Sequence, residues 1–531
     1  MPLSPRELRE RFKSKVVKRA IWENHWQELA DFILPNKNSI TTKRSKGEKT
    51  NTHLFDNTAI QANELLAGAL HGLLTNPYTQ WFELYTGNPD IDSDDGARLW
   101  LQDSTRRMHT VINDSNFQTE IHEYYLDLPA FGTAPLLMEE DEETIVRFMA
   151  IHIGNIYISE NNKGFIDEAY RTFEWPARLI VANFGLDEAN LSKKVMSAYK
   201  QNSDEVFKLL HGVYPNADTD SSGKLSNFPF ISHYTVLDED EDISVKGFNE
   251  FPFIIGRWSK ISDEEYGRGP GMTALPEAKT INKMTEMTLL GAAKMINPPL
   301  QMPDDGFVLP LKTFPGGVNY YRAGGTDRVE ALLSKDFRID FGEAMMEKHR
   351  QRIREAFFVD QLQLGTGPQM TATEVNQRTE EKLRLLAPVL GRQQNETLGP
   401  IVSRLFKIMD RKKLFLPMPD IIRNAGGLGV RYSSQIARIQ KQAEGDNILK
   451  TVQAASPFIQ ADPTVLDNFD GDESIREIAR IYNFPQKMIR PKVEVEKIRK
   501  GRQQAQEQAA QQQQQTAAAD NLSKVKPAIQ G

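Results

Sequence analysis

The alternation of apolar and polar positions is most regular in the middle of the chain, where its period changes several times. Long stretches repeat with the 3.6-residue period of an amphipathic helix, and a Pro- and Gly-rich stretch between them does not. The pattern predicts, in order, a helix over 272–297, a β-type insert over 298–326, a helix over 337–358, a loop over 361–369 and a very long helix over 371–415.

The very long helix is the clearest of these elements. From Val375 onward apolar residues share one face and charged residues fill the other, as in an amphipathic helix. A straight run of this length would reach roughly 60 Å. Pro388 and Pro400 each remove a backbone donor and crowd the preceding turn, so we expect a kinked helix. The pattern fits both an ordinary core helix and a framework helix in an assembly.

The first 270 residues mix helical and strand patterns, which predicts an α+β fold that is mostly α-helical. We expect Asn57 or Thr58 to cap the second helix, because either side chain can accept from first-turn amides. The helical patterns cover 4–34, 58–74, 94–113, 117–128, 176–184, 190–201 and 204–211, and the strand patterns cover 81–84, 144–148, 155–158, 165–173, 230–237, 243–248 and 253–258.

Two segments of this part carry concentrated charge. Basic residues crowd the first helix and the loop 37–49. They are either a solvated face with a mobile loop or an electrostatic contact with nucleic acid or an acidic neighbour. The hairpin turn 238–242 is wholly acidic and is expected to be exposed, because like charges need water to screen them.

Beyond the long helix the pattern weakens. A proline-bounded linker (416–420) and a Gly-rich stretch (426–432) precede a helix over 434–455 and a helical module over 463–489. The Gln- and Ala-rich end, 502–520, is low in complexity and predicts frayed helix or disorder.

Composition narrows the class of protein. The chain has 531 residues, a formal net charge of -7 and no cysteine. Its length predicts several domains, and the lack of cysteine excludes disulfides and thiolate metal sites. Without a segment approaching the ~20 apolar residues of a membrane span, we expect a soluble protein made in a cytoplasm. Overall acidity argues against a sequence-reading DNA binder.

The chain offers no recognisable active site. It lacks Walker A, H-E-x-x-H and G-x-S-x-G patterns, and its nine histidines are scattered. The glycine-rich turn 265–271 has neither G-x-G-x-x-G spacing nor a following Lys-Ser/Thr, which disfavours phosphate binding. We therefore expect a structural or interaction protein without cofactor or metal.

Five segments in a fixed order carry a resemblance to a known family. The chain resembles the portal proteins, or head-to-tail connectors, of short-tailed T7-like bacteriophages. Coverage extends from the first helix to the long helix and lapses in about the last hundred residues. The matching segments are 26–35, 55–59, 73–77 with Trp81 and Phe82, 266–271, and 370–375 with Arg378.

The resemblance implies a non-enzymatic ring of twelve subunits at one capsid vertex, with a channel for packaging, retaining and ejecting double-stranded DNA. Its implied partners are the terminase large subunit, the tail adaptor, and the scaffold, major capsid and internal core proteins, with no membrane. Since the chain has no motor sequence, ATP hydrolysis would belong to the terminase. The implied location is the virion, after assembly in the host cytoplasm.

The resemblance also divides the chain into the parts of a portal subunit. The implied division is wing 1–270, stem helix 271–297, clip 298–336, stem helix 337–358, tunnel loop 359–370, long helix and wing return 371–433, crown 434–501 and low-complexity tail 502–531.

Three sets of candidate contact residues follow. A small, uncharged loop can touch DNA without holding it, because tight binding needs Lys or Arg at phosphates. The stem cations either face the channel or form salt bridges with Glu343 or Glu347. The insert is too short to bury its own core and needs neighbours. The candidates are Gln361, Gln363, Leu364, Gly365, Thr366, Gly367, Pro368 and Gln369 in the DNA-channel loop; Lys348, Arg350, Arg352 and Arg354 in the stem; and Phe307, Phe314, Tyr320 and Tyr321 in the clip.

A second hypothesis is a monomeric or dimeric, nucleic-acid-associated accessory protein that forms no ring. In that case the long helix is simply core. The mass of the purified protein separates the two hypotheses.

Overall fold

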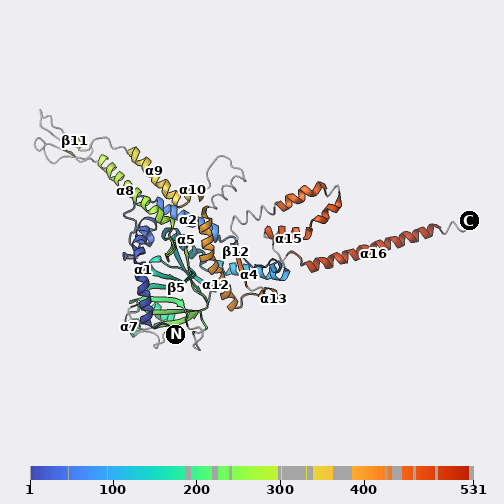
Figure 1. The fold of residues 1–531 in the computed structure, drawn as a ribbon, viewed down its shortest axis with the longest axis horizontal. Helices are drawn as coiled ribbons and strands as arrows, with labels where there is room; N and C mark the ends of the chain where they lie inside the picture. The colour runs from blue at the N-terminus through green and yellow to red at the C-terminus, as the bar shows by residue number, and fades with distance from the viewer. Residues whose placement is uncertain are drawn as a thin grey trace. The chain divides into compact units, whose positions relative to one another are not determined.

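The computed structural model describes residues 2–525 except 46, 93, 186–192, 218–224, 226, 238–241, 297–299, 302–329, 332–338, 363–384, 425–426, 433–444, 446, 459–461, 483 and 485–487. These residues form two compact units, one from Met1–Pro77 with Val111–Ile408 and the other from Tyr78–Thr110 with Met409–Gly531 (Figure 1).

Four helices form the helical layer of the first unit: α1 (Pro5–Ile33), α2 (Thr58–Leu74), α5 (Phe117–Phe131) and α8 (Pro270–Ile296). Ser4 and Glu7 start α1 with a reciprocal capping box, in which each side chain accepts from the other's backbone amide. α5 ends at Gly132, which has a φ of 77° that glycine adopts without strain. α5 contacts α1, α2 and α8, so it is the centre of this layer.

The first unit also contains two antiparallel sheets. In the smaller one, β2 (Thr133–Glu140) lies between β3 (Val146–Ala150) and β9 (Phe253–Arg257). The larger has the order β4 (Ile156–Glu160), β5 (Ile166–Pro176), β6 (Val206–Pro215), β7 (Phe230–Val236) and β8 (Asp242–Phe248). Leu8 and Phe12 of α1 pack with Tyr157, Tyr170 and Leu210 of the larger sheet. A separate apolar cluster joins that sheet to α6 (Ala177–Phe184) and α7 (Lys193–Gln201).

Residues 204–211 correct one prediction, because β6 occupies most of the segment that was expected to be helical. Leu209 of β6 belongs to the apolar cluster with α6 and α7, and Leu210 belongs to the cluster with α1. A strand covered on both faces reads as a continuous apolar run, which periodicity cannot separate from a buried helix.

Two further expectations at side-chain level are wrong. Neither Asn57 nor Thr58 caps α2 with its side chain; instead the Asp56 carboxylate accepts from the Thr58 amide at 2.9 Å. In the acidic turn, 238–241 lie outside the described residues, while Asp242 pairs with the buried imidazole of His233. Asp242 is therefore part of the structure and more than a solubilising charge.

The two helices expected around the insert are present as an antiparallel hairpin. α8 lies beside α9 (Ile339–Ala356), and the short helix α10 (Val359–Leu362) follows (Figure 1). Between them the structure describes β10 (Leu300–Gln301) and β11 (Glu330–Ala331), which pair antiparallel. The rest of the insert lies outside the described residues.

The predicted long helix is described from residue 385. Residues 385–393 are helical, a π-helical segment η3 (Gln394–Leu398) follows, and α12 (Gly399–Arg411) continues. The π segment ends two residues before Pro400, whose missing amide interrupts regular helical bonding. The helix ends at Arg411 rather than at 415, and Lys413 adopts a φ of 55° just beyond it. Residues 371–384 lie outside the described part.

The second unit pairs β1 (Phe82–Tyr85) with β12 (Gly429–Tyr432) in an antiparallel ribbon. Trp100 of α4 (Asp95–Asp114) donates to the Leu416 carbonyl at 2.9 Å. Of the open alternatives for 502–520, the helix is observed, as part of α16. The remaining elements are α3 (Pro89–Asp92), α13 (Asp420–Arg423), helical residues 447–458, η4 (Pro463–Asn468), α15 (Gly471–Ile481) and α16 (Lys492–Val525).

Among the described residues, no helix combines the length and the apolar composition required to cross a membrane.

Candidate channel and assembly surfaces

The hairpin of α8 and α9 is attached to the start of α2 by the segment 55–58, one of the five segments that carried the resemblance. The Asn282 side chain of α8 accepts from the amides of Phe55 and Asp56, at 2.6 and 3.3 Å. Its amide nitrogen donates to the His53 carbonyl at 2.9 Å. Asn282 therefore fixes the chain entering α2 onto α8.

Asp56 makes the matching connection to α9. One carboxylate oxygen accepts from the Thr58 amide, and the other accepts from Arg350 Nε at 3.1 Å. The Asp56 side chain is only 7% exposed. Since an ion pair withdrawn from water is screened less by salt, this contact holds α9 more firmly than a surface pair would.

Arg350 and Arg354 converge on Glu347, on the same side of α9. Arg354 Nη1 lies 3.0 Å from the Glu347 carboxylate and Arg350 Nη1 lies 3.4 Å from it. The hydrogen bond from Arg354 lowers the pKa of Glu347. This is the pairing with Glu347 that the sequence left open as the alternative to a channel-facing position.

Another side of α9 pairs with α8. Glu277 of α8 contacts His349 and accepts from Arg352 at 3.3 Å. The hydrogen bond from His349 lowers the pKa of Glu277. Lys348 is exposed, and within the described part of the chain it makes no ion pair. Three of the four predicted stem cations thus have carboxylate partners inside the subunit.

The predicted DNA-channel loop is described at its start alone. Gln361 lies in α10, its amide donates to the Phe358 carbonyl at 3.1 Å, and its side-chain oxygen is buried. Gln363, Leu364, Gly365, Thr366, Gly367, Pro368 and Gln369 lie outside the described residues, as do Phe307, Phe314, Tyr320 and Tyr321 of the predicted clip.

Phe358 makes the sharp turn between α9 and α10. It has a φ of 58°, a left-handed value that a bulky residue adopts only when its surroundings hold it there. Its neighbours Phe357 and Val359 are buried, and its ring lies 6.3 Å from that of Trp258. Packing on both sides therefore fixes the direction in which the chain enters the predicted loop.

The glycine-rich turn 266–271 packs against the end of α5. A Cβ atom on Gly271 would lie 2.6 Å from the Ala130 carbonyl, and side chains on Gly267 and Gly269 would meet backbone atoms of Gly132 and Pro129. Close backbone approach explains these glycines. The turn thus has a packing role, which agrees with the absence of a phosphate-binding pattern.

The basic residues of α1 and the following loop divide into two groups. Arg19 is buried and donates to the carbonyls of Ile153 and Ile156, and Lys15 donates to Ser159 at 2.7 Å. Lys37 pairs with the buried Asp127 at 2.7 Å. These cations hold the fold together, whereas Lys13 is exposed, so the electrostatic-contact interpretation applies at most to part of the cluster.

A buried ionic network was not detected from the sequence. Arg257 of β9 is 3% exposed and binds Glu396 of the π segment at 2.9 Å, as well as Glu160 of β4. Burial alone would lower the pKa of Arg257, but the hydrogen bonds and charges of Glu396 and Glu160 outweigh it and raise that pKa. Because these residues lie far apart in sequence, no local pattern could have identified the network.

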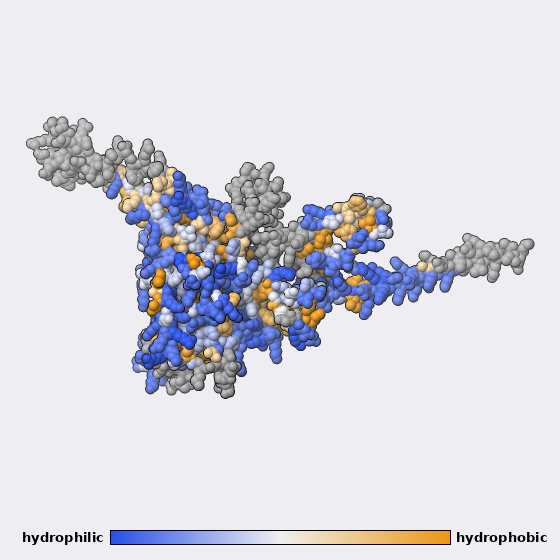
Figure 2. Space-filling view, viewed as in Figure 1, coloured by the Kyte–Doolittle hydropathy of each residue, from blue (hydrophilic) through white to orange (hydrophobic). Residues whose placement is uncertain are grey.

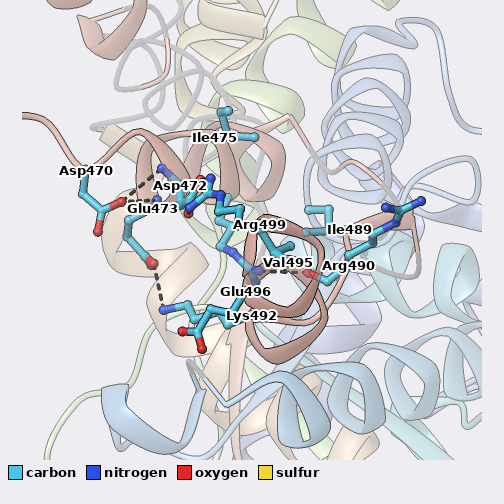
Figure 3. Close-up of a pocket in the computed structure, with 11 residues that line it drawn as sticks. Asp470, Asp472, Glu473, Ile475, Ile489, Arg490, Lys492, Val495, Glu496 and Arg499 are labelled. Carbon is cyan, nitrogen blue, oxygen red and sulfur yellow. Dashed lines mark hydrogen bonds and ion pairs between the residues drawn. The ribbon is translucent and has the colours of Figure 1, made fainter. Parts of the chain in front are cut away.

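A charged pocket lies between α15 and the first turns of α16 (Figure 3). Arg499 donates two hydrogen bonds to Asp472, at 2.6 and 2.7 Å, and Lys492 pairs with Glu473 at 3.1 Å. Arg476 donates to the Arg490 carbonyl at 2.8 Å. The pocket residues thus pair with one another, and the cluster joins α15 to α16 rather than presenting free charge to a ligand.

Across the described ranges no group of three or more His, Asp or Glu side chains could hold a metal ion.

Comparison with known proteins places the chain. The family described as bacteriophage head to tail connecting protein matches residues 6–489. The chain is 30% identical to the Probable portal protein of Bordetella phage BPP-1, over 96% of this chain and 92% of that protein. It is 31% identical to the Portal protein of Salmonella phage epsilon15, over 91% of this chain and 88% of that protein.

Among solved structures, a chain from the virion of a native gene transfer agent particle aligns with 78% of this chain and 91% of its own length. The TM-score is 0.36 and the identity is 10%, and no argument rests on that likeness. The family match and the two phage relatives each span most of the sequence. The chain therefore belongs to the bacteriophage head to tail connecting protein family.

Proposed function

We propose that this protein is the portal subunit of a tailed phage, and that copies of it form a ring at one capsid vertex around a channel for double-stranded DNA. The observation that carries the proposal is the family match over 6–489, together with two relatives named as portal proteins that align over nearly the whole chain. Twelve is the subunit number that the resemblance implies.

The parts of the subunit are assigned on the same basis. The hairpin of α8 and α9 is proposed as the stem, 298–336 as the clip, 359–370 as the tunnel loop, 1–270 as the wing and 434–501 as the crown. The firm attachment of α8 and α9 to α2 through Asn282 and Asp56 supports a stem that acts as a rigid extension of the wing.

Charge pairing along α9 supports a channel that conducts DNA without gripping it. Tight binding to DNA comes largely from Lys and Arg that neutralise phosphates. Arg350, Arg352 and Arg354 already have carboxylate partners in Asp56, Glu277 and Glu347. Lys348 is the stem cation most available to a phosphate within the described part of α9. The uncharged residues of 363–369 are proposed to touch DNA at the constriction.

The proposed partners follow from this position. The clip would dock the terminase large subunit during packaging and the tail adaptor afterwards, and scaffold, major capsid and internal core proteins would surround the wing. The subunit itself would be a structural component of the virion and not an enzyme.

Electron microscopy of the purified protein tests the proposal. The expected images are closed rings with a central hole wide enough for duplex DNA. Compact particles without a hole at every concentration would favour the non-ring accessory protein instead.

A further inference from the structure

The distal part of α8, residues 287–296, is apolar on more than one side. It contains a single charged residue, Lys294. Large apolar side chains remain exposed along it, with Leu290 50% and Ile296 85% exposed, and Met287, Leu289 and Met295 are similarly exposed. Figure 2 shows apolar surface near this end of the first unit. Since a helix that is apolar all round is normally buried, a single neighbour, α9, leaves it incompletely covered.

The contacts between α8 and α9 show which side of each helix faces outward. Glu277 and Thr285 of α8 contact Arg352 and Met346 of α9. At 3.6 residues per turn, Leu290 points about 140° away from both contact residues on α8. Ala344 likewise points about 160° away from Met346. Leu290 and Ala344 therefore mark opposite outer flanks of the hairpin.

The two outer flanks complement each other. On α8, Lys283 and Lys294 outnumber Glu286 around Leu290; on α9, Glu347 and Glu355 outnumber Lys348 around Ala344. Lys294 and Glu355 are exposed. A contact between the flanks would cover Leu290 and Ala293 with Ala344 and bring the opposite net charges together.

We infer that the outer flank of α8, around Leu290, docks on the outer flank of α9, around Ala344, of a second copy of this chain. The two flanks differ in composition, so the contact is heterologous, and a repeated heterologous contact closes into a ring when its rotation permits. The inference rests on the proposed ring and assigns the surfaces by which the neighbouring stems meet.

Cysteine cross-linking tests the inference, because the natural chain has no cysteine. Leu290→Cys and Ala344→Cys are made in separate full-length chains, which are co-expressed, purified and treated with a short bis-maleimide. The two positions differ in height along the hairpin by about 4.5 Å, within reach of such a reagent. Each chain alone is a control, and Met345→Cys, which is also exposed but about 100° round α9, replaces Ala344→Cys in a matched control.

The expected result is a covalent dimer in the mixture of Leu290→Cys and Ala344→Cys chains. The dimer should be several-fold stronger than in the mixture that contains Met345→Cys, and absent from either chain alone.

Rings that form without this dimer would overturn the inference while leaving the proposed function standing. Equal cross-linking in the Met345→Cys mixture, or a dimer from Leu290→Cys chains alone, would do the same. Rings without the dimer are expected if 297–338 of the same chain cover the flank. Absence of rings from every sample would contradict the proposed function and the inference with it.

Discussion

Arg350 of α9 and Asp56, which lies just before α2, form an ion pair with an Nε to Oδ2 distance of 3.1 Å. The two residues are 294 positions apart in sequence. The pair, with Asn282 on α8, connects the hairpin proposed as the stem to the helical layer of the first unit.

Replacing Asp56 should loosen the hairpin. Asp56→Asn keeps an oxygen for the Thr58 amide but removes the charge facing Arg350, so we expect about 1–3 kcal/mol less stability. Hydrogen exchange of the α9 amides should speed up most. Glu10→Gln, at the exposed pair with Arg6, is the matched control and should change nothing measurable. Unchanged exchange of α9 in Asp56→Asn would show that the ion pair does not hold the hairpin.

The buried network around Arg257 predicts a larger effect. Glu396→Gln leaves the guanidinium of Arg257 with Glu160 as its remaining carboxylate partner in the network, and we expect a loss of up to about 3 kcal/mol in chemical unfolding. Arg392→Gln, which removes the outer partner of Glu396, should cost about 0–1 kcal/mol. Equal losses in the two variants would contradict the importance of the buried contact.

His211 predicts a pH dependence of stability. Burial, followed by the charges of Arg171 and His233, lowers the pKa of His211 well below its ordinary value. The unfolded chain therefore takes up a proton near about pH 6.5 that the folded chain refuses. This contribution to stability is fully present above about pH 6.5 and is lost as the pH falls below it.

The slope should be at most about 1.4 kcal/mol per pH unit for this one group. His211→Phe, which keeps a ring to stack on Tyr234, should show a shallower decline in thermal stability between about pH 6.5 and 5 than the natural chain. Ser232→Ala removes the hydrogen-bond partner of His211 and leaves the titrating group, so its decline should stay steep. The same slope in His211→Phe and the natural chain would exclude His211 as a source of the dependence.

Bulky residues in the proposed tunnel loop should affect DNA rather than assembly. Gly365→Trp with Gly367→Trp should leave rings intact and impair genome packaging or retention in an in vivo complementation assay. Ser14→Trp, on the exposed side of α1, is a bulk-matched control. Normal packaging and retention by the loop variant would place the constriction elsewhere.

Local periodicity predicted what local chemistry determines. The helices 272–297 and 337–358 appear as α8 and α9 within a few residues, and Pro400 coincides with an irregular turn. β6 was misread because it is buried on both faces. The partners of Asp56, Arg257 and His211 could not be predicted, because each is supplied by distant segments that only the tertiary fold brings together.

Mass measurement of the purified full-length protein by light scattering tests the central claim most directly. The chain weighs 60.3 kDa. The account predicts a discrete, closed assembly of many subunits, near twelve chain masses, that persists on dilution. A mass near one or two chains under all conditions would contradict the ring.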